Sequence, residues 1–201
     1  DGRDIAAVGP YSELRDGLPA AVVDLPDHAL CPGLVDAHSH VGIHTLGDEH
    51  AQLSRSRAEV VLRAAEWLRR DLQAGVTTMR TVGDRDFMDI TFRQLQAEGV
   101  VEAPRLVVAG NLLRSSLVDV SVAEHVCNGP DALRAHLRES VRRGADWVKL
   151  YATPFSKAPD PVMPAFSREE IAVIVDEARR AARPVAVHCH GGKTADWCIE
   201  L

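Results

Sequence analysis

The chain has 201 residues, of which 46% are hydrophobic and 26% are charged, a composition that excludes disordered and collagen-like classes. Its net charge of −6 comes without a basic stripe, and no apolar run approaches the roughly 18 residues of a membrane span, so neither nucleic acid nor membrane is an expected partner. Four cysteines without a C-x-x-C pair exclude a disulfide scaffold and favour a reducing, cytoplasmic location, although a removed targeting segment stays open because the chain begins at Asp1.

Residues 1–30 are predicted to form short strands of a small β-domain. One strand is expected around Ile5–Val8, before a Gly-Pro turn, and another at residues 21–25, before Pro26. The pattern changes at Cys31, and from there to residue 201 strand-like and helix-like segments alternate. We therefore expect a domain boundary between residues 30 and 31.

Five apolar runs in the second part have the pattern of parallel strands covered on both faces: residues 34–40, 76–82, 106–109, 147–151 and 185–189. Helices are expected between them, because Ser56 and Ser167 each begin a capping-box pattern and Pro130 stands at a helix start that ends at Gly144. Such alternation predicts an α/β fold with a parallel sheet, open or closed into a barrel. Since a complete (β/α)₈ barrel takes about 250 residues, either the sheet is open or the chain is part of a longer protein.

Two histidines end the first predicted strand. His38 and His40 are two residues apart, so both imidazoles project to the same side and reach one point. Imidazole is a good ligand for zinc and similar metals. The alternative is a pair of histidines fixed by hydrogen bonds at the strand end. Three further histidines, His44, His50 and His125, are expected in solvated loops.

A lysine lies inside the fourth predicted strand. Burial of Lys149 as a cation is costly, and the chain otherwise prefers arginine, with only three lysines among 23 basic residues. A neutral amine at this position can act as a base, form a Schiff base or take up CO₂ as a carbamate. The alternative is a surface lysine on an edge strand.

The fifth strand ends with a second pair of histidines, His188 and His190, again on one side of the strand. Cys189 points the other way and is expected to be a small buried apolar residue. Because His188 follows the apolar run directly, it should lie deeper than His190, which precedes two glycines.

The order of these features resembles the amidohydrolase superfamily of metal-dependent hydrolases. Residues 32–40, 75–83, 144–149 and 185–191 are similar to its imidazolonepropionase-like branch, which includes metal-dependent prolidases and Xaa-amino-acid dipeptidases. The resemblance covers nearly the whole chain. It implies a (β/α)₈ TIM-type barrel, of which residues 31–201 hold strands one to five, and residues 1–30 resemble part of the family's small β-sandwich domain.

The resemblance also implies a centre of two divalent metal ions, with zinc expected. His38 and His40 would hold one ion and His188 the other, while Lys149, carrying CO₂ as a carbamate, would bridge both. A metal-bridging hydroxide would then cleave an amide C–N bond. The family also uses a histidine of strand six and an aspartate of strand eight. Neither strand is among the 201 residues, so this chain alone is expected to lack a complete active site.

The expected substrate is a dipeptide or an N-acyl amino acid. On the substrate side, His190 is implied as a contact, Tyr151 lies on the same face of the strand as Lys149, and Arg80 is a candidate for binding a carboxylate. An ion pair of Arg80 with Asp36 or Asp84 is the alternative. A cyclic-amide hydrolase, a deaminase and an inactive or metal-binding fragment remain competing interpretations, and a homo-oligomer is left open.

Overall fold

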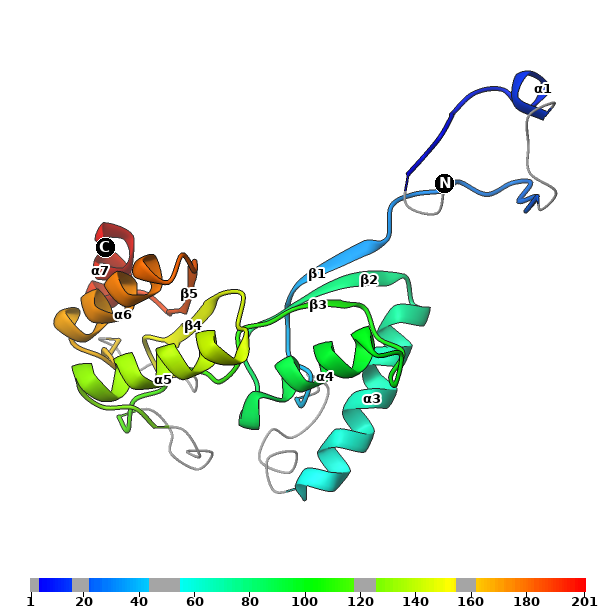
Figure 1. The fold of residues 1–201 in the computed structure, drawn as a ribbon. Coiled ribbons are helices and arrows are strands. Elements are labelled where there is room, and N and C mark those ends of the chain that lie inside the picture. The colour runs from blue at the N-terminus through cyan, green and yellow to red at the C-terminus, as the bar shows by residue number, and fades with distance from the viewer. Residues whose placement is uncertain (1–3, 16–21, 44–54, 118–125, 155–161) are drawn as a thin grey trace. The chain divides into compact units, whose positions relative to one another are not determined.

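The computed structural model describes residues 4–15, 22–43, 55–117, 126–154 and 162–201 (Figure 1). The chain divides into two units, Asp1–Pro32 and Gly33–Leu201. His44, His50 and His125 lie outside the described residues. The four cysteines are all free thiols, and no helix in the described ranges is long and apolar enough to cross a membrane.

The strands predicted in the first unit are wrong. Its described residues, 4–15 and 22–32, form one short helix, α1 (Tyr11–Leu14), and no strand at Ile5–Val8 or at residues 22–25. A strand needs a hydrogen-bonding neighbour and a buried face, whereas Ile5 and Val8 are 85% and 88% exposed. The segments with alternating apolar residues therefore form no strand pairs over the described part of this unit. The assignment of the unit to a β-sandwich stays a prediction.

The second unit confirms the predicted alternation of strands and helices. The five strands begin and end within two residues of their predicted limits, and all strand pairs are parallel. In chain order the elements are β1 (Leu34–Ser39), α3 (Arg57–Gln73), β2 (Val76–Thr81), η2 (Arg85–Phe87), α4 (Met88–Ala97), β3 (Arg105–Val107), α5 (Pro130–Arg143), β4 (Val148–Tyr151), α6 (Arg168–Arg180), β5 (Val185–His188) and α7 (Gly192–Glu200).

The described strands form two sheets, with orders β1-β2-β3 and β4-β5. Figure 1 shows α3 and α4 on one face of the first sheet. Between β3 and β4 the ladder stops, and there the Val108 amide donates to the Asp146 carboxylate (2.8 Å). The segments still touch: the Asp146 amide donates to the Val108 carbonyl (2.8 Å), and Leu113 and Leu150 form a parallel bridge further on.

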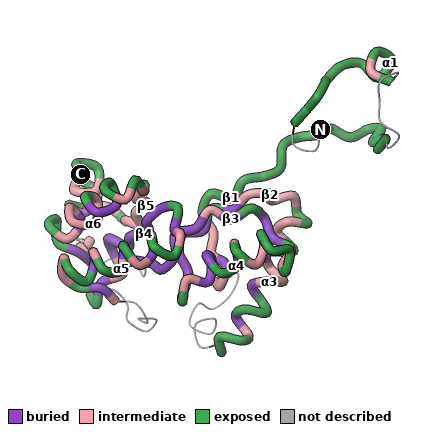
Figure 2. Tube along the Cα trace, in the orientation of Figure 1, coloured by how far each residue is buried: buried purple, intermediate pink, exposed green. Residues whose placement is uncertain are grey.

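Each sheet has its own apolar core toward its helices (Figure 2). In β4, Val148 and Leu150 belong to the core with α5 and α6. Because side chains alternate along a strand, Lys149 and Tyr151 point to the opposite face. On that face a small cluster of Val82, Ala109 and Trp147 forms. The fold therefore directs the candidate chemical groups away from the helices.

Candidate metal centre

His38 and His40 lie at the end of β1 with their rings close together. Their ring centroids are 6.3 Å apart and their planes are nearly perpendicular, at 72°. The Nδ1–H of His40 donates to the Gly83 carbonyl (2.6 Å), and since a carbonyl only accepts, this leaves Nε2 of His40 as the atom with a free lone pair. Burial lowers the pKa of both histidines, and the nearby charge of Lys149 lowers it further. Both effects favour the neutral form of the imidazoles, which is the form that binds a cation.

Asp84, which the sequence offered only as a partner for Arg80, holds the chain just after His40. Its carboxylate accepts from the amides of Val41 (2.9 Å) and Gly42 (2.7 Å), and its own amide donates to the Gly110 carbonyl (2.9 Å). Burial raises the pKa of Asp84, and the two amide donors oppose that rise. The residue thus ties the end of β1 to the segments that follow β2 and β3. The pattern Gly-Asp directly after a buried strand was the available signal for it.

Lys149 is buried in the centre of β4, with 3% of its surface exposed. Burial lowers the pKa of its amine, and the positive charge of Arg80 lowers it further. Its Nζ lies 5.3 Å from the centroid of the Tyr151 ring. No carboxylate in the described ranges forms an ion pair with it. The surface-lysine alternative is therefore wrong, because this amine is buried without an acid.

Tyr151 and His188 face each other across the β4–β5 pair, where they are register partners. Their rings stack with centroids 4.8 Å apart and an interplanar angle of 23°. His188 also meets His190, with the two Nε2 atoms 3.1 Å apart, so one ring donates and the other accepts. Burial lowers the pKa of His188 to about 4, with His190 and Lys149 adding to the shift. His188 is half-buried and His190 is exposed.

Arg80 makes contacts that the sequence did not predict. Its Nε donates to the Ala37 carbonyl (2.8 Å), and its guanidinium lies 4.8 Å from the centre of the Trp147 ring. The structure has neither of the ion pairs considered for it: Asp84 accepts from backbone amides, and Asp36 accepts from the amide of His38 (3.0 Å). A role for Arg80 in binding substrate stays a prediction.

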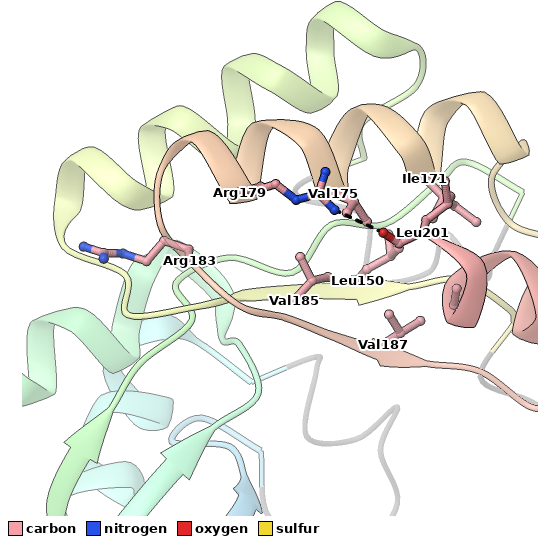
Figure 3. Close-up of a pocket in the computed structure, with 9 residues that line it drawn as sticks. Leu150, Ile171, Val175, Arg179, Arg183, Val185, Val187 and Leu201 are labelled. Atoms are coloured by element: carbon pink, nitrogen blue, oxygen red, sulfur yellow. Dashed lines mark hydrogen bonds between the residues drawn. The ribbon is translucent and has the colours of Figure 1, made fainter.

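A pocket of about 330 Å³ lies away from these residues, beside β5, α6 and α7 (Figure 3). Its lining is mostly aliphatic, and at one end Arg179 donates to the Leu201 carbonyl (3.2 Å). Leu150 lines it, on the face of β4 opposite to Lys149. None of the seven candidate site residues contributes to it, so this pocket is separate from the candidate centre. The lining residues are Leu150, Ile171, Val175, Arg179, Arg183, Val185, Val187, Cys198 and Leu201.

Residues 29–200 match the family model described as the amidohydrolase family. The chain belongs to the amidohydrolase family. The match spans every strand of the second unit and all seven candidate site residues, so the resemblance inferred from the histidine and lysine motifs is confirmed.

Among curated proteins, this amidohydrolase chain is 38% identical over 68 residues to ochratoxinase of Aspergillus niger, a stretch that is 33% of this chain and 14% of that protein. It is 25% identical over 159 residues to an uncharacterised protein of Mycobacterium tuberculosis, covering 79% of this chain and 39% of that protein. The chain thus spans well under half the length of these relatives.

Among solved structures, a Xaa-Pro dipeptidase with methionine bound in its active site superposes with a TM-score of 0.73 at 26% identity. The alignment covers 84% of this chain and 46% of that one. The structure of Aspergillus niger ochratoxinase gives a TM-score of 0.71 at 24% identity, over 84% of this chain and 45% of that one, and supports the fold alone. This amidohydrolase chain therefore has an α/β fold that aligns with about half of these larger proteins.

The residues present fit a metal centre, although no three His, Cys, Asp or Glu side chains within the described ranges converge on one point. The ligand assignment expected from the sequence does not require three such side chains at one ion. It assigns two imidazoles, His38 and His40, to one ion and one imidazole, His188, to the other. Neutral imidazoles and a carbonyl-bonded Nδ1 are typical of metal-binding histidines. The charge of Lys149 adds to the lowering of the pKa of all three histidines.

Proposed function

We propose that this chain carries the first five strands of a metal-dependent hydrolase that cleaves an amide C–N bond. The observation that supports the proposal best is Lys149, a buried lysine that no carboxylate in the described ranges pairs with and whose charge lowers the pKa of His38, His40 and His188. A lysine so placed is unfavourable as a cation, and a function that converts it to an anion between cations explains its position.

Each residue has a chemical role in this proposal. His38 and His40 would hold one divalent ion, expected to be zinc, and His188 would hold a second. The neutral amine of Lys149 would bond to the carbon of CO₂ and release a proton to solvent, and the resulting carbamate would be an anionic ligand for the metal. When bound, the metals would acidify a water and polarise the amide carbonyl.

The substrate is proposed to be a dipeptide or an N-acyl amino acid. The similar dipeptidase structure contains a bound methionine, which is the kind of product that such a reaction releases. Tyr151 and His190 lie beside His188 and are the proposed substrate contacts, with Arg80 as a further candidate. Cyclic-amide hydrolysis and deamination use the same groups, and product analysis separates them, because only deamination releases ammonia.

Replacement of Lys149 tests the proposal. In the full-length protein, Lys149→Ala should lose bound metal and nearly all hydrolysis of an N-acyl amino acid panel, measured by elemental analysis and amino-acid release. Bicarbonate with a short carboxylic acid should restore part of both, because an added carboxylate can occupy the bridging position. Lys193→Ala, at an exposed lysine of α7, is the matched control and should behave as wild type. Full metal content and activity in Lys149→Ala would contradict the carbamate role.

A further inference from the structure

Arg114 is held by its backbone at the same strand ends as the candidate centre. The residue before it, Leu113, donates its amide to the Lys149 carbonyl (2.9 Å) and accepts from the Tyr151 amide (3.0 Å). The Arg114 carbonyl accepts from the Cys127 amide (2.8 Å). The backbone is therefore fixed on both sides, and Arg114 follows directly on a segment that pairs with β4.

The side chain of Arg114 lies against residues of the proposed site. Its guanidinium carbon is 4.8 Å from the centroid of the Tyr151 ring, which itself stacks on His188. Arg114 thus lies beside the β4–β5 pair, on the face where substrate is proposed to bind. Stacking on an aromatic ring also fixes the plane of a guanidinium.

Among the described residues, Arg114 has no acidic partner. Most helix-surface arginines in the described ranges pair with a carboxylate on the same helix or a neighbouring one, as Arg138 does with Glu177 at 2.6 Å. No such pair exists for Arg114 in the described ranges, and its Nε is buried there without any acceptor. A buried donor left unpaired costs free energy that an incoming acceptor recovers. The planar fork of arginine matches a carboxylate with two parallel hydrogen bonds.

We propose that Arg114 binds the carboxylate of the substrate, an inference that rests on the proposed hydrolase function. It makes the site selective for amides whose released part carries a free carboxylate next to the amide nitrogen, as in dipeptides and N-acyl amino acids. Arg80 is less suited, because its Nε already donates to the Ala37 carbonyl and its guanidinium lies over Trp147.

The test compares a carboxylate with its amide in two assays of the metal-loaded, full-length protein. Hydrolysis is measured with N-acetyl-L-methionine and N-acetyl-L-methioninamide, and binding by calorimetry with L-methionine and L-methioninamide. Arg114→Gln should weaken both hydrolysis and binding of the carboxylate compounds by about 10- to 100-fold, the value of a charge-assisted hydrogen bond, and leave the amides within about two-fold. Arg114→Lys should fall between, because it keeps the charge and loses the fork.

Arg63→Gln, at an exposed arginine of α3, controls for loss of a positive charge, and Arg80→Gln tests the competing residue. Equal losses on carboxylate and amide, or a carboxylate-specific loss in Arg80→Gln alone, would overturn the assignment. If the wild type hydrolyses neither compound but binds L-methionine in an Arg114-dependent way, the hydrolase proposal fails and the carboxylate site stands. If it hydrolyses the carboxylate compound and Arg114→Gln is indifferent, the reverse holds.

Discussion

The contact between His188 and His190 brings two imidazole nitrogens to one point. Their Nε2 atoms are 3.1 Å apart, so one ring carries a proton there and the other a lone pair. The two residues differ in their surroundings: His188 is half-buried and stacked on Tyr151, whereas His190 is exposed and its amide donates to the Thr153 hydroxyl (3.1 Å). The more enclosed ring, with its lowered pKa, is the better candidate for a permanent ligand.

This difference predicts separate effects of two substitutions. His188→Ala should lose one of two metals and nearly all turnover, because it removes the only imidazole assigned to that ion. His190→Asn should keep both metals and lower kcat/KM by about 10-fold or more, as expected for one lost charge-assisted hydrogen bond in the transition state. Metal analysis of both variants in the full-length protein checks this. Loss of zinc from the His190 variant alone would reverse the two roles.

At the residue scale, the sequence predicts which side of a strand a residue occupies but not which partner a long side chain finds. Period-two alternation correctly separates Lys149 and Tyr151 from Leu150, which packs toward the helices. The Arg80 side chain instead reaches the Ala37 carbonyl, 43 positions earlier in the chain, and that contact depends on the register between β1 and β2. Arg114 has no signal in the sequence for the same reason, since only the tertiary structure brings the Tyr151 ring against its guanidinium.

At the element scale, sequence signals formed by residues close together in the chain correctly predict where helices begin and end. Ser167 forms a complete capping box with Glu170, Pro130 is the first residue of α5, and Gly144 ends α5 with a positive φ of 104° that favours glycine. The box at Ser56 is only half formed: its hydroxyl accepts from the Glu59 amide, but the Glu59 carboxylate pairs with Arg63 (2.8 Å). Arg63 and also Arg55 (3.4 Å) thus compete with the N-cap amide for this carboxylate.

The packing of α5 on α6 includes a largely buried carboxylate, and it predicts a pH dependence. A hydrogen bond from Arg138 holds the pKa of Glu177 below its usual range. A folded-state pKa below the unfolded value stabilises the fold above the unfolded pKa, and this stabilisation is lost as the pH falls below about 4. Glu177→Gln should therefore lower the free energy of unfolding by about 1–2 kcal/mol at pH 7 and by little near pH 3.

Denaturant unfolding at the two pH values measures this difference. Asp176→Asn, at the neighbouring and exposed carboxylate of α6, is the matched control and should differ little from wild type at either pH. An equal loss for Glu177→Gln at pH 7 and pH 3 would mean that packing of the side chain matters and its charge does not.

At the scale of the second unit, the two sheets are joined by few backbone hydrogen bonds, and a side chain replaces part of the missing ladder. The Asp146 carboxylate accepts from the Val108 amide (2.8 Å) and from Arg93 (2.9 Å), and Arg93 also donates to the Gly144 carbonyl (2.8 Å). A parallel five-stranded order was the natural expectation from the alternating pattern. The pattern does not predict the contact of Asp146 with the Val108 amide, because a side chain that replaces a backbone hydrogen bond leaves no periodic signal in the sequence.

Removal of that carboxylate should therefore destabilise the unit more than removal of an ordinary surface acid. Asp146→Ala leaves the Val108 amide without its acceptor and Arg93 without its ion pair, which should cost about 2–3 kcal/mol and lower the thermal midpoint by about 5–10 °C. Asp131→Ala, at a fully exposed acid of α5 that pairs with Arg134, removes the same group from a surface pair and should change the midpoint by about 2 °C or less. Hydrogen exchange adds a local readout, because the Val108 amide should exchange faster in Asp146→Ala while amides inside α3 keep their rates. Equal midpoints for the two variants would mean that the sheets are held together by their apolar contacts, with Asp146 contributing little.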